Sequence, residues 1–369
     1  MNNLQSRIQR VIDGLVESGA ERGLQVAVYR HGELLVDAVA GLADAATGRM
    51  VTADTPFNVH STGKGVTATI THILAERGLF GYDTPIVELW PEFGAHGKGK
   101  ATVRHALTHT VGVPSLPADT TIAEVCDWDR ICAIVADMPP SWEPGTKTGY
   151  HAYTFGFVLG EIVRRATGKP IAQVLREEVG VSLGIADEIF FGMPEAELGR
   201  IARLEDAPGS AEWLASLPED SEMWQMAPRA IFPNAEFGNR ADVLMASIPA
   251  GGKMTARAVA RMYAALLGEV DGVRLISPDR LREVSAVAFE GDDALFGNPA
   301  TWALGYSIGR PGSTAEESPT WFGMVGAGGS CAYADTASGF SFAVAKNRLT
   351  FDLNAVEAVV EIVAEAAGS

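Results

Sequence analysis

The hydrophobic and polar positions along the chain separate helical stretches from strand-like ones. Apolar residues at helical spacing predict amphipathic helices over residues 3–18 and 255–267. Strand-like runs at residues 24–29 and 34–39, joined by a short polar turn, predict a β-hairpin. Strand-like alternation returns in the last quarter of the chain, at residues 302–308, 332–334 and 340–344.

A final helix is expected to begin at Asn354. Glu357 follows three residues later, as in a capping box. Its buried face would consist of valines at helical spacing: Val356, Val359, Val360 and Val363.

The middle of the chain, from about residue 103 to residue 252, is mostly helical in pattern and is interrupted by loops rich in proline and glycine. Helices are predicted at residues 104–109, 131–138 and 157–167. Residues 203–245 contain few periodic runs. A long irregular stretch in a compact protein usually forms a lid or a wall of a functional site.

Strands at both ends with helices between them predict an α+β fold. The simplest packing joins both ends in one antiparallel sheet, flanked by the terminal helices and the helix after residue 61. Residues 1–80 plus 253–369 would then form a domain with the central sheet, and residues 81–252 a mostly helical second domain. The active site is expected in the cleft between the two domains.

The segment Ser61-Thr62-Gly63-Lys64 carries the first candidate chemistry. Apolar residues behind it repeat at helical spacing, so Ser61 lies at the start of a helix and Lys64 projects from the same face. A serine hydroxyl becomes a nucleophile when a base removes its proton, and burial lowers the pKa of a lysine toward that task. The alternative for this tetrapeptide alone is a serine N-cap followed by a surface lysine.

Two later stretches could complete a site. Tyr150 follows a Pro144-Gly145 turn, and a lysine ammonium beside it would lower its pKa from roughly 10 and make it a general base. Residues 321–330 contain four glycines in a strand-like region, which predicts an edge strand and a turn whose amides could hold an oxyanion. An ordinary half-buried tyrosine and a glycine-rich hairpin are the alternatives.

Composition limits the function classes. The net charge of −17 offers no basic stripe for nucleic acid or an anionic membrane. Three cysteines without C-x-x-C spacing indicate a reducing compartment, and no apolar run approaches the ~18 residues of a membrane span. The N-terminal stretch reads as an amphipathic helix and not as a signal peptide. We therefore expect a cytoplasmic protein.

No metal or cofactor is expected. His105 and His109 are four residues apart, but no glutamate follows His105 as in a zinc-binding helix. His109 is expected to satisfy local backbone groups instead.

Together and in this order, these stretches resemble the serine β-lactamase-like superfamily: class C β-lactamases, D-alanyl-D-alanine carboxypeptidases, and related esterases and transacylases. The matching segments extend over nearly the whole chain and are residues 57–64, 107–114, 144–150, 248–250 and 326–330. The resemblance implies a β-lactamase/transpeptidase-like fold, with Ser61 as nucleophile and Lys64 and Tyr150 as its proton-handling partners. It also implies an oxyanion hole formed by the backbone N–H groups of Ser61 and Ala327.

Departures from the lactamase pattern indicate a branch of this superfamily. In lactamases of this type the tyrosine is followed by serine or alanine and then asparagine, whereas here Tyr150 is followed by His151 and Ala152. The Tyr150-His151 pair and the segment 343–348 look most like the esterase/transacylase branch.

The third motif departs as well. Lactamases have Lys-Thr-Gly or similar there and many of the esterases have His-x-Gly, but this chain has Met324-Val325-Gly326. Without a cation at that position, a carboxylate-bearing β-lactam or D-Ala-D-Ala peptide loses a main anchor. Met324, Val325, Gly326 and His151 are assigned to the substrate-binding wall.

The sequence thus predicts a serine hydrolase that cleaves small-molecule carboxylic esters through an acyl-Ser61 intermediate. A transacylase could use the same residues and pass the acyl group to an alcohol or amine of a natural product. A weak β-lactamase or D-Ala-D-Ala peptidase, and an inactive binding protein on the same scaffold, are further alternatives. The sequence specifies neither the acyl group nor the acceptor nor the oligomeric state.

Overall fold

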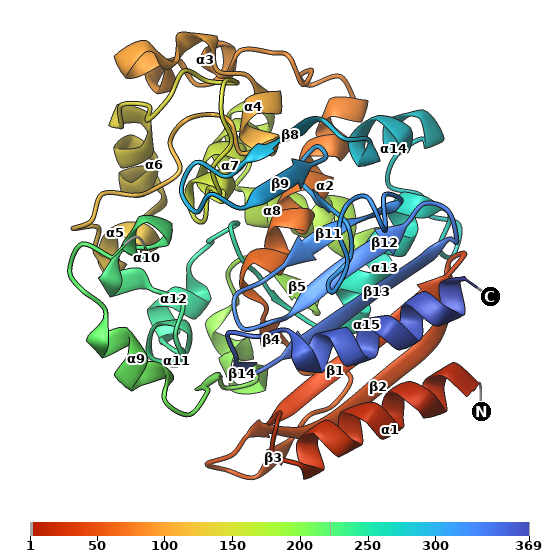
Figure 1. The fold of residues 1–369 in the computed structure, drawn as a ribbon. Helices are drawn as coiled ribbons and strands as arrows, with labels where there is room; N and C mark the ends of the chain where they lie inside the picture. Colours follow the sequence, from red (N-terminus) through yellow and green to blue (C-terminus); the bar gives the residue numbers. More distant parts are fainter. Residues whose placement is uncertain (1–2, 222, 369) are drawn as a thin grey trace.

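Strands from both ends of the chain form one nine-stranded antiparallel sheet in a computed structural model that describes residues 3–221 and 223–368 (Figure 1). The strand order is β3-β2-β1-β13-β12-β11-β10-β9-β8. β1 (Gly23–Arg30) pairs with β13 (Phe340–Lys346), which joins the N-terminal hairpin to the C-terminal strands. The other strands are β2 (Glu33–Asp44), β3 (Arg49–Met50), β8 (Phe289–Asp292), β9 (Pro299–Trp302), β10 (Ser307–Ile308), β11 (Trp321–Val325) and β12 (Cys331–Asp335).

Helices cover both faces of this sheet, which explains why β1 is buried on both sides. α1 (Asn3–Glu17) and α15 (Asn354–Ala367) lie side by side on one face, as Figure 1 shows. α13 (Ala256–Leu267) packs on the other face, in the same core as α2 (Gly63–Glu76). Successive side chains of β1 point to opposite faces. Val26 and Val28 pack in the core beneath α1 and α15, whereas Ala27 packs in the core with α13 and α2. The predicted α+β fold, with an antiparallel sheet flanked by helices, is confirmed.

Helices of the middle region gather beside the sheet, with α7 packed against α2 (Figure 1). Among the helices that the structure describes, none has both the length and the apolar character that crossing a bilayer requires. The helices of this region are α3 (Ile86–Leu89), α4 (Val103–Leu107), α5 (Ile122–Cys126), α6 (Trp128–Asp137), α7 (Thr154–Thr167), α8 (Ile171–Leu175), α9 (Ser210–Ser216), α10 (Met223–Met226), α11 (Ala235–Gly238) and α12 (Ala241–Met245). α14 (Pro278–Ser285) follows α13.

Two small sheets connect distant parts of the chain. β4 (Phe57–Asn58) and β5 (Ile189–Phe190) both pair with β7 (Lys253–Met254), while β6 (Glu205–Asp206) runs parallel to β14 (Arg348–Leu349). The first of these sheets contains strands from both predicted domains. The domain division at residues 80/81 and 252/253 therefore stays a proposal.

Three local expectations were wrong. Residues 302–308 form two strands and not one, because the chain turns at Gly305, whose φ is 85°. β11 is an internal strand between β12 and β10, and not a sheet edge. No capping box forms at Asn354: Leu353 is the N-cap, and the backbone N–H of Asn354 donates to the carboxylate of Asp352 at 3.1 Å.

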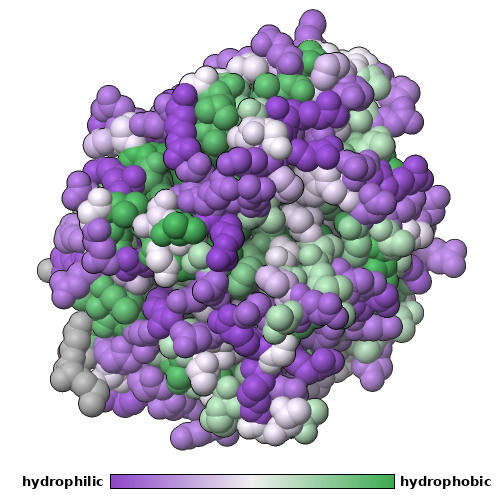
Figure 2. All heavy atoms as spheres, turned by 180° about the vertical axis from the view of Figure 1, so that it is seen from behind, coloured by the Kyte–Doolittle hydropathy of each residue, from purple (hydrophilic) through white to green (hydrophobic). Residues whose placement is uncertain are grey.

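The surface is mostly hydrophilic, as expected if the apolar residues lie mainly in the core. Seen from behind in Figure 2, hydrophilic residues cover most of the face, and hydrophobic residues appear in separate patches. Isolated apolar side chains on a surface are normal in proteins of this kind.

Candidate active site

Ser61 lies at the leading end of α2, as its sequence position predicts. It is the middle residue of a single 3-10 turn, His60–Thr62, which runs directly into the helix. His60 has a φ of 46°, a left-handed conformation that is uncommon for a residue with a side chain. The hydroxyl of Thr62 donates to the carbonyl of Ser330 at 2.8 Å, which fastens this turn to the glycine-rich segment.

The absence of a side chain at Gly63 brings a second backbone segment against this turn. A Cβ there would lie 2.3 Å from the carbonyl carbon of Gly251, so any larger residue would push the two segments apart. The same segment places the carbonyl of Ala250 3.1 Å from the Nζ of Lys64. The missing side chain at Gly63 thus allows the Ala250 carbonyl to reach the amine of Lys64, the next residue.

Lys64 is fully buried, and its amine lies within hydrogen-bond distance of Ser61. Its Nζ lies 2.9 Å from the Ser61 Oγ, 2.7 Å from the carbonyl oxygen of Ala152, and 3.1 Å from that of Ala250. Burial lowers the pKa of Lys64 well below its usual value. Carbonyls only accept hydrogen bonds, so a neutral amine gives both of its hydrogens to them and turns its lone pair to the Ser61 hydroxyl.

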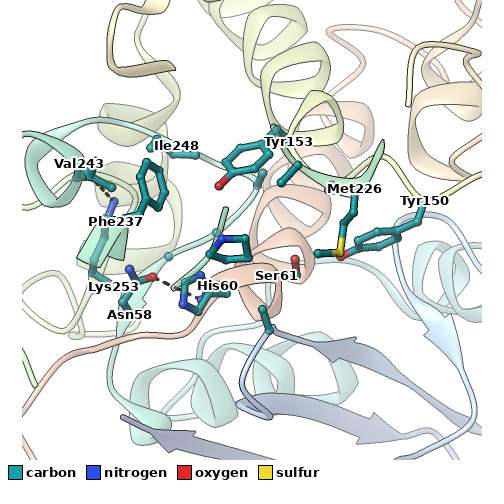
Figure 3. Close-up of a pocket in the computed structure, with 17 residues that line it drawn as sticks. Asn58, His60, Ser61, Tyr150, Tyr153, Met226, Phe237, Val243, Ile248 and Lys253 are labelled. Atoms are coloured by element: carbon teal, nitrogen blue, oxygen red, sulfur yellow. Dashed lines mark hydrogen bonds between the residues drawn. The ribbon is translucent and has the colours of Figure 1, made fainter. Parts of the chain in front are cut away.

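Tyr150 lines the same cavity as Ser61 (Figure 3), but the predicted fall of its pKa is wrong. Burial raises the pKa of Tyr150, and this outweighs the lowering effect of its side-chain hydrogen bond with Ser61. The Nζ of Lys64 lies over the ring, 4.8 Å from its centre, and burial lowers the pKa of this amine, which weakens the counter-charge it could offer a phenolate. Tyr150 is therefore a protonated phenol at neutral pH.

Backbone contacts and ring packing hold Tyr150 in place. Its N–H donates to the carboxylate of Asp293 at 2.7 Å. Its ring is parallel to that of Trp302, with 6.2 Å between the ring centres, and lies 5.0 Å from that of His109. These neighbours come from three different segments, so the position of Tyr150 depends on the whole fold.

His109 contacts backbone from a distant segment and not the local backbone that was expected. Its Nδ1 accepts a hydrogen bond from the backbone N–H of His151 at 3.0 Å, and its ring stacks on Phe155. Within the described part of the chain, no group of three or more histidine, cysteine or carboxylate side chains could hold a metal ion.

His151 does not line the cavity beside Ser61. Its ring is buried; Nδ1 donates to the carbonyl of Gly149 at 2.6 Å, and Nε2 accepts from the N–H of Val113 at 3.1 Å. Burial lowers its pKa to about 3, consistent with a neutral ring in which each nitrogen has a backbone partner. This geometry gives His151 the task of holding the loop around Tyr150 and leaves no ring nitrogen for substrate.

The glycine-rich segment turns beside Ser61. The N–H of Gly329 donates to the carbonyl of Gly326 at 2.9 Å, which closes a turn whose second residue, Ala327, lines the cavity. A Cβ on Gly326 would lie 3.1 Å from the backbone nitrogen of Ser61, so this glycine allows the two backbones to meet. The oxyanion hole expected from the N–H groups of Ser61 and Ala327 stays a prediction.

The other residues assigned to the substrate-binding wall lie elsewhere. Met324 is buried in β11 opposite Ala332, and Val325 packs against the core beneath α1 and α15. Neither residue lines the cavity, and Gly326 acts through its close approach to Ser61. The observed wall comes from a different part of the chain.

A cavity of about 70 Å³ opens beside Ser61 (Figure 3). Residues of the irregular stretch 203–245 supply much of its apolar wall, as that stretch was expected to do. From this stretch come Met226, Ala227, Pro233, Phe237 and Val243, and Ile248 follows shortly after it. Sequence reasoning missed each of them individually, and it also missed the polar lining residues Asn58, His60, Tyr153 and Lys253. Asn58, His60 and Ile248 lie inside the matching segments 57–64 and 248–250, but no motif marks the others, because only the tertiary packing of loops brings them together.

Known proteins with similar sequences include members of one family and two named esterases. The model of the family described as "Beta-lactamase" matches residues 8–365. The chain is 34% identical over 343 residues to "Esterase/beta-lactamase LipL" of Mycobacterium tuberculosis, covering 89% of this chain and 77% of that protein. It is 30% identical over 217 residues to "Esterase EstB" of Burkholderia gladioli, covering 54% of each chain.

Solved structures agree with these matches. A family VIII carboxylesterase superposes with a TM-score of 0.87 at 29% identity, covering 98% of this chain and 97% of the other. A penicillin-binding protein homologue from Caulobacter crescentus gives 0.85 at 30% identity, covering 99% and 98%. Because the family model spans nearly the whole sequence and the folds coincide, the chain belongs to the beta-lactamase family.

Proposed function

We propose that this protein is a serine hydrolase that cleaves carboxylic esters through an acyl-Ser61 intermediate. The observation that carries the proposal is the buried amine of Lys64, 2.9 Å from the Ser61 hydroxyl and bonded otherwise only to two carbonyls. Similarity to proteins named esterase and carboxylesterase supports the choice of ester over other acyl substrates.

Acylation begins with proton transfer from Ser61 to Lys64. The Ser61 oxygen attacks the ester carbonyl carbon, and the resulting oxyanion accepts hydrogen bonds from the N–H groups of Ser61 and Ala327. Collapse of this intermediate breaks the bond to the alkoxide. Lys64 returns the proton to the leaving oxygen, with the Tyr150 hydroxyl as relay: it gives its own proton to the alkoxide and takes one from the ammonium.

Deacylation reverses these roles. Lys64, again neutral, accepts a proton from a water molecule, and the hydroxide formed attacks the acyl carbonyl. The Ser61 oxygen leaves and regains a proton, which releases the carboxylic acid. A neutral Tyr150 fits this cycle better than the phenolate that the sequence suggested, because a relay needs a proton to pass on.

The size of the cavity restricts the acyl group. A cavity of about 70 Å³ accepts several water molecules, roughly five to seven at about 10–15 Å³ each, which is room for a short acyl chain. A series of 4-nitrophenyl esters from acetate to octanoate tests the function. We expect fast turnover of the short esters and a decline with chain length. Failure to hydrolyse every ester, with no covalent adduct from an organophosphonate, would favour the inactive binding protein.

A transacylase is the second candidate. A partial match, 29% identical over 160 residues and 37% of this chain, is to a protein named monacolin J acid methylbutanoyltransferase from Aspergillus terreus. The two functions differ only in whether water or another nucleophile takes the acyl group from Ser61. Adding alcohols and amines to a hydrolysis assay decides between them, because a transferase forms a new ester or amide at the expense of free acid.

Turnover of β-lactams should be weak. Met324 is buried in β11, and residues 324–326 supply no cationic side chain to anchor a substrate carboxylate. A lost charge-assisted hydrogen bond of about 1.5–3 kcal/mol corresponds to roughly 10- to 100-fold. We therefore expect kcat/KM for nitrocefin to lie at least about 10-fold below that for 4-nitrophenyl butyrate. Equal values for the two substrates would show that another group holds the carboxylate.

We also propose that the protein acts in the cytoplasm. Its cysteines, Cys126, Cys132 and Cys331, are all free thiols, as is usual in a reducing compartment. Fractionation of cells that produce the protein, with a cytoplasmic marker enzyme as reference, tests this location.

A further inference from the structure

The cavity beside Ser61 contains polar side chains, and most of them already have partners in the protein. The Nζ of Lys253 donates to the carbonyls of Phe191, Val243 and Ala246 at 2.6, 3.2 and 3.2 Å. Burial lowers the pKa of Lys253 to about 7, and in either protonation state its two or three hydrogens are taken by these carbonyls. Its role is to tie the cavity wall together.

Tyr153 and Asn58 are engaged in the same way. The hydroxyl of Tyr153 donates to the carbonyl of Ile231 at 2.5 Å. The amide of Asn58 donates to the carbonyl of Gly238 and accepts from the N–H of His60, both at 3.4 Å. These two side chains support the wall and leave little capacity for hydrogen bonding to substrate.

His60 differs from these neighbours. Its Nε2 atom is buried and has no hydrogen-bond partner among residues 3–221 and 223–368. Figure 3 shows the His60 ring at the cavity, between Asn58 and Ser61. Burial lowers its pKa to about 4, so the ring is neutral at neutral pH and Nε2 either donates or accepts one hydrogen bond.

The backbone fixes this nitrogen relative to the nucleophile. His60 directly precedes Ser61 and has the left-handed φ of 46°, a strain that usually persists only where the surroundings enforce it. The backbone of Gly251 packs on it, since a Cβ on that glycine would lie 3.2 Å from the His60 carbonyl oxygen. An acyl chain entering the cavity therefore meets the side chain of a residue whose backbone is held in place.

An unsubstituted alkyl chain leaves this buried nitrogen unpaired, and a buried polar atom without a partner costs free energy. A hydroxyl group both donates and accepts, so it pairs with Nε2 in either tautomer. A carboxylate only accepts, and it would lose its hydration beside a neutral ring. We propose that His60 is a specificity-determining residue whose Nε2 hydrogen-bonds a hydroxyl group on the acyl chain, so that esters of hydroxy acids are the preferred substrates. This inference rests on the proposed esterase function.

Two pairs of 4-nitrophenyl esters of matched size test it. The first pair is 3-hydroxybutyrate and 3-methylbutyrate, and the second is 5-hydroxyhexanoate and 5-methylhexanoate. Each kcat/KM is divided by the rate of alkaline hydrolysis of the same ester, which removes differences in intrinsic reactivity. We expect the hydroxy ester of at least one pair to be favoured about 10- to 100-fold in the natural enzyme.

Substitutions at His60 should remove this preference. In His60→Leu and His60→Asn the ratio within each pair should fall close to one; asparagine tolerates the left-handed backbone but is too short to replace the ring nitrogen. His96→Leu is the matched control, because His96 has a similar φ of 55° and lies on the surface beside Asp137. Its ratio should stay that of the natural enzyme.

The outcomes separate this inference from the esterase proposal. Ratios near one for both pairs in the natural enzyme, or a preference retained in both His60 variants, would overturn the role of His60 while leaving ester hydrolysis intact. If the 4-nitrophenyl monoester of succinate turned over faster than every hydroxy ester, the preferred group on the acyl chain would be a carboxylate and not a hydroxyl. This result would also overturn the proposed role of His60. Absence of all hydrolysis would instead contradict the proposed function. Because the first comparison uses the natural enzyme, the test does not depend on the folding of a variant.

Discussion

Replacing Ser61 with alanine is expected to lower kcat/KM for 4-nitrophenyl butyrate by roughly 10⁴- to 10⁶-fold, the loss seen when a serine hydrolase loses its nucleophile. Alanine has no oxygen to form the acyl intermediate, and the Lys64 amine that now faces Ser61 at 2.9 Å would lose that partner. Initial rates under pseudo-first-order conditions give the ratio directly.

Ser285→Ala is the control for this experiment. Ser285 lies on α14, and its hydroxyl donates to the carbonyl of Leu281, a bond internal to that helix. We expect its activity to equal that of the natural enzyme. A Ser61→Ala variant that folds and keeps a tenth or more of the activity would show that another group carries the acyl chain.

Replacing Lys64 with methionine is expected to lower kcat/KM by about 10²- to 10⁴-fold, the usual contribution of a general base. Methionine has a similar length and fills the buried site, but its thioether does not take the serine proton under these conditions. The carbonyls of Ala152 and Ala250 also lose their donors, so some loss of stability accompanies the change. Activity is therefore measured per folded molecule, with the folded fraction taken from circular dichroism.

Lys98→Met separates the chemical effect from the structural one. Lys98 is another fully buried lysine, and its ammonium donates to the carbonyls of Ala95, Ala136 and Met138 far from Ser61 along the chain. Its replacement should lower the melting temperature without changing kcat/KM per folded molecule. Similar losses of activity in both variants would mean that Lys64 acts through stability alone.

The sequence predicts the central part of the site because its chemistry is local. Ser61 and Lys64 lie three residues apart, and the helical spacing behind them determines which side chains share a face. The fold class follows from alternation at both ends of the chain, which pairs β1 with β13. In both cases the residues that determine the feature lie in one or two short segments of the sequence.

The remaining features depend on contacts that no single segment contains. The pKa of Tyr150 rises because the effect of burial outweighs that of its hydrogen bond with Ser61. His151 is turned away from the cavity by hydrogen bonds with Gly149 and Val113. The sequence does not show either arrangement, since both arise from the packing of loops.

The cavity wall illustrates the same limit. The irregular pattern of residues 203–245 indicates a wall, but the contacts that place Phe237 and Met226 beside Ser61 are long-range. The edge position expected for β11 failed for a related reason. β11 pairs with β12 on one side and β10 on the other, and Gly326, just beyond it, approaches Ser61 and not solvent.

The central claim is that a neutral Lys64 removes the proton of Ser61, and the rate at which an organophosphonate labels Ser61 as a function of pH tests it most directly. Only the unprotonated amine is a base, so the labelling rate falls as pH drops through the pKa of Lys64 and becomes constant above it. Burial lowers this pKa well below 10.5. Intact-protein mass and peptide mapping should therefore show a single adduct on Ser61, with a rate that levels off well below pH 10. A rate that climbs about tenfold per pH unit up to pH ~10, the behaviour of an unperturbed lysine, or an adduct on another residue, would contradict the account.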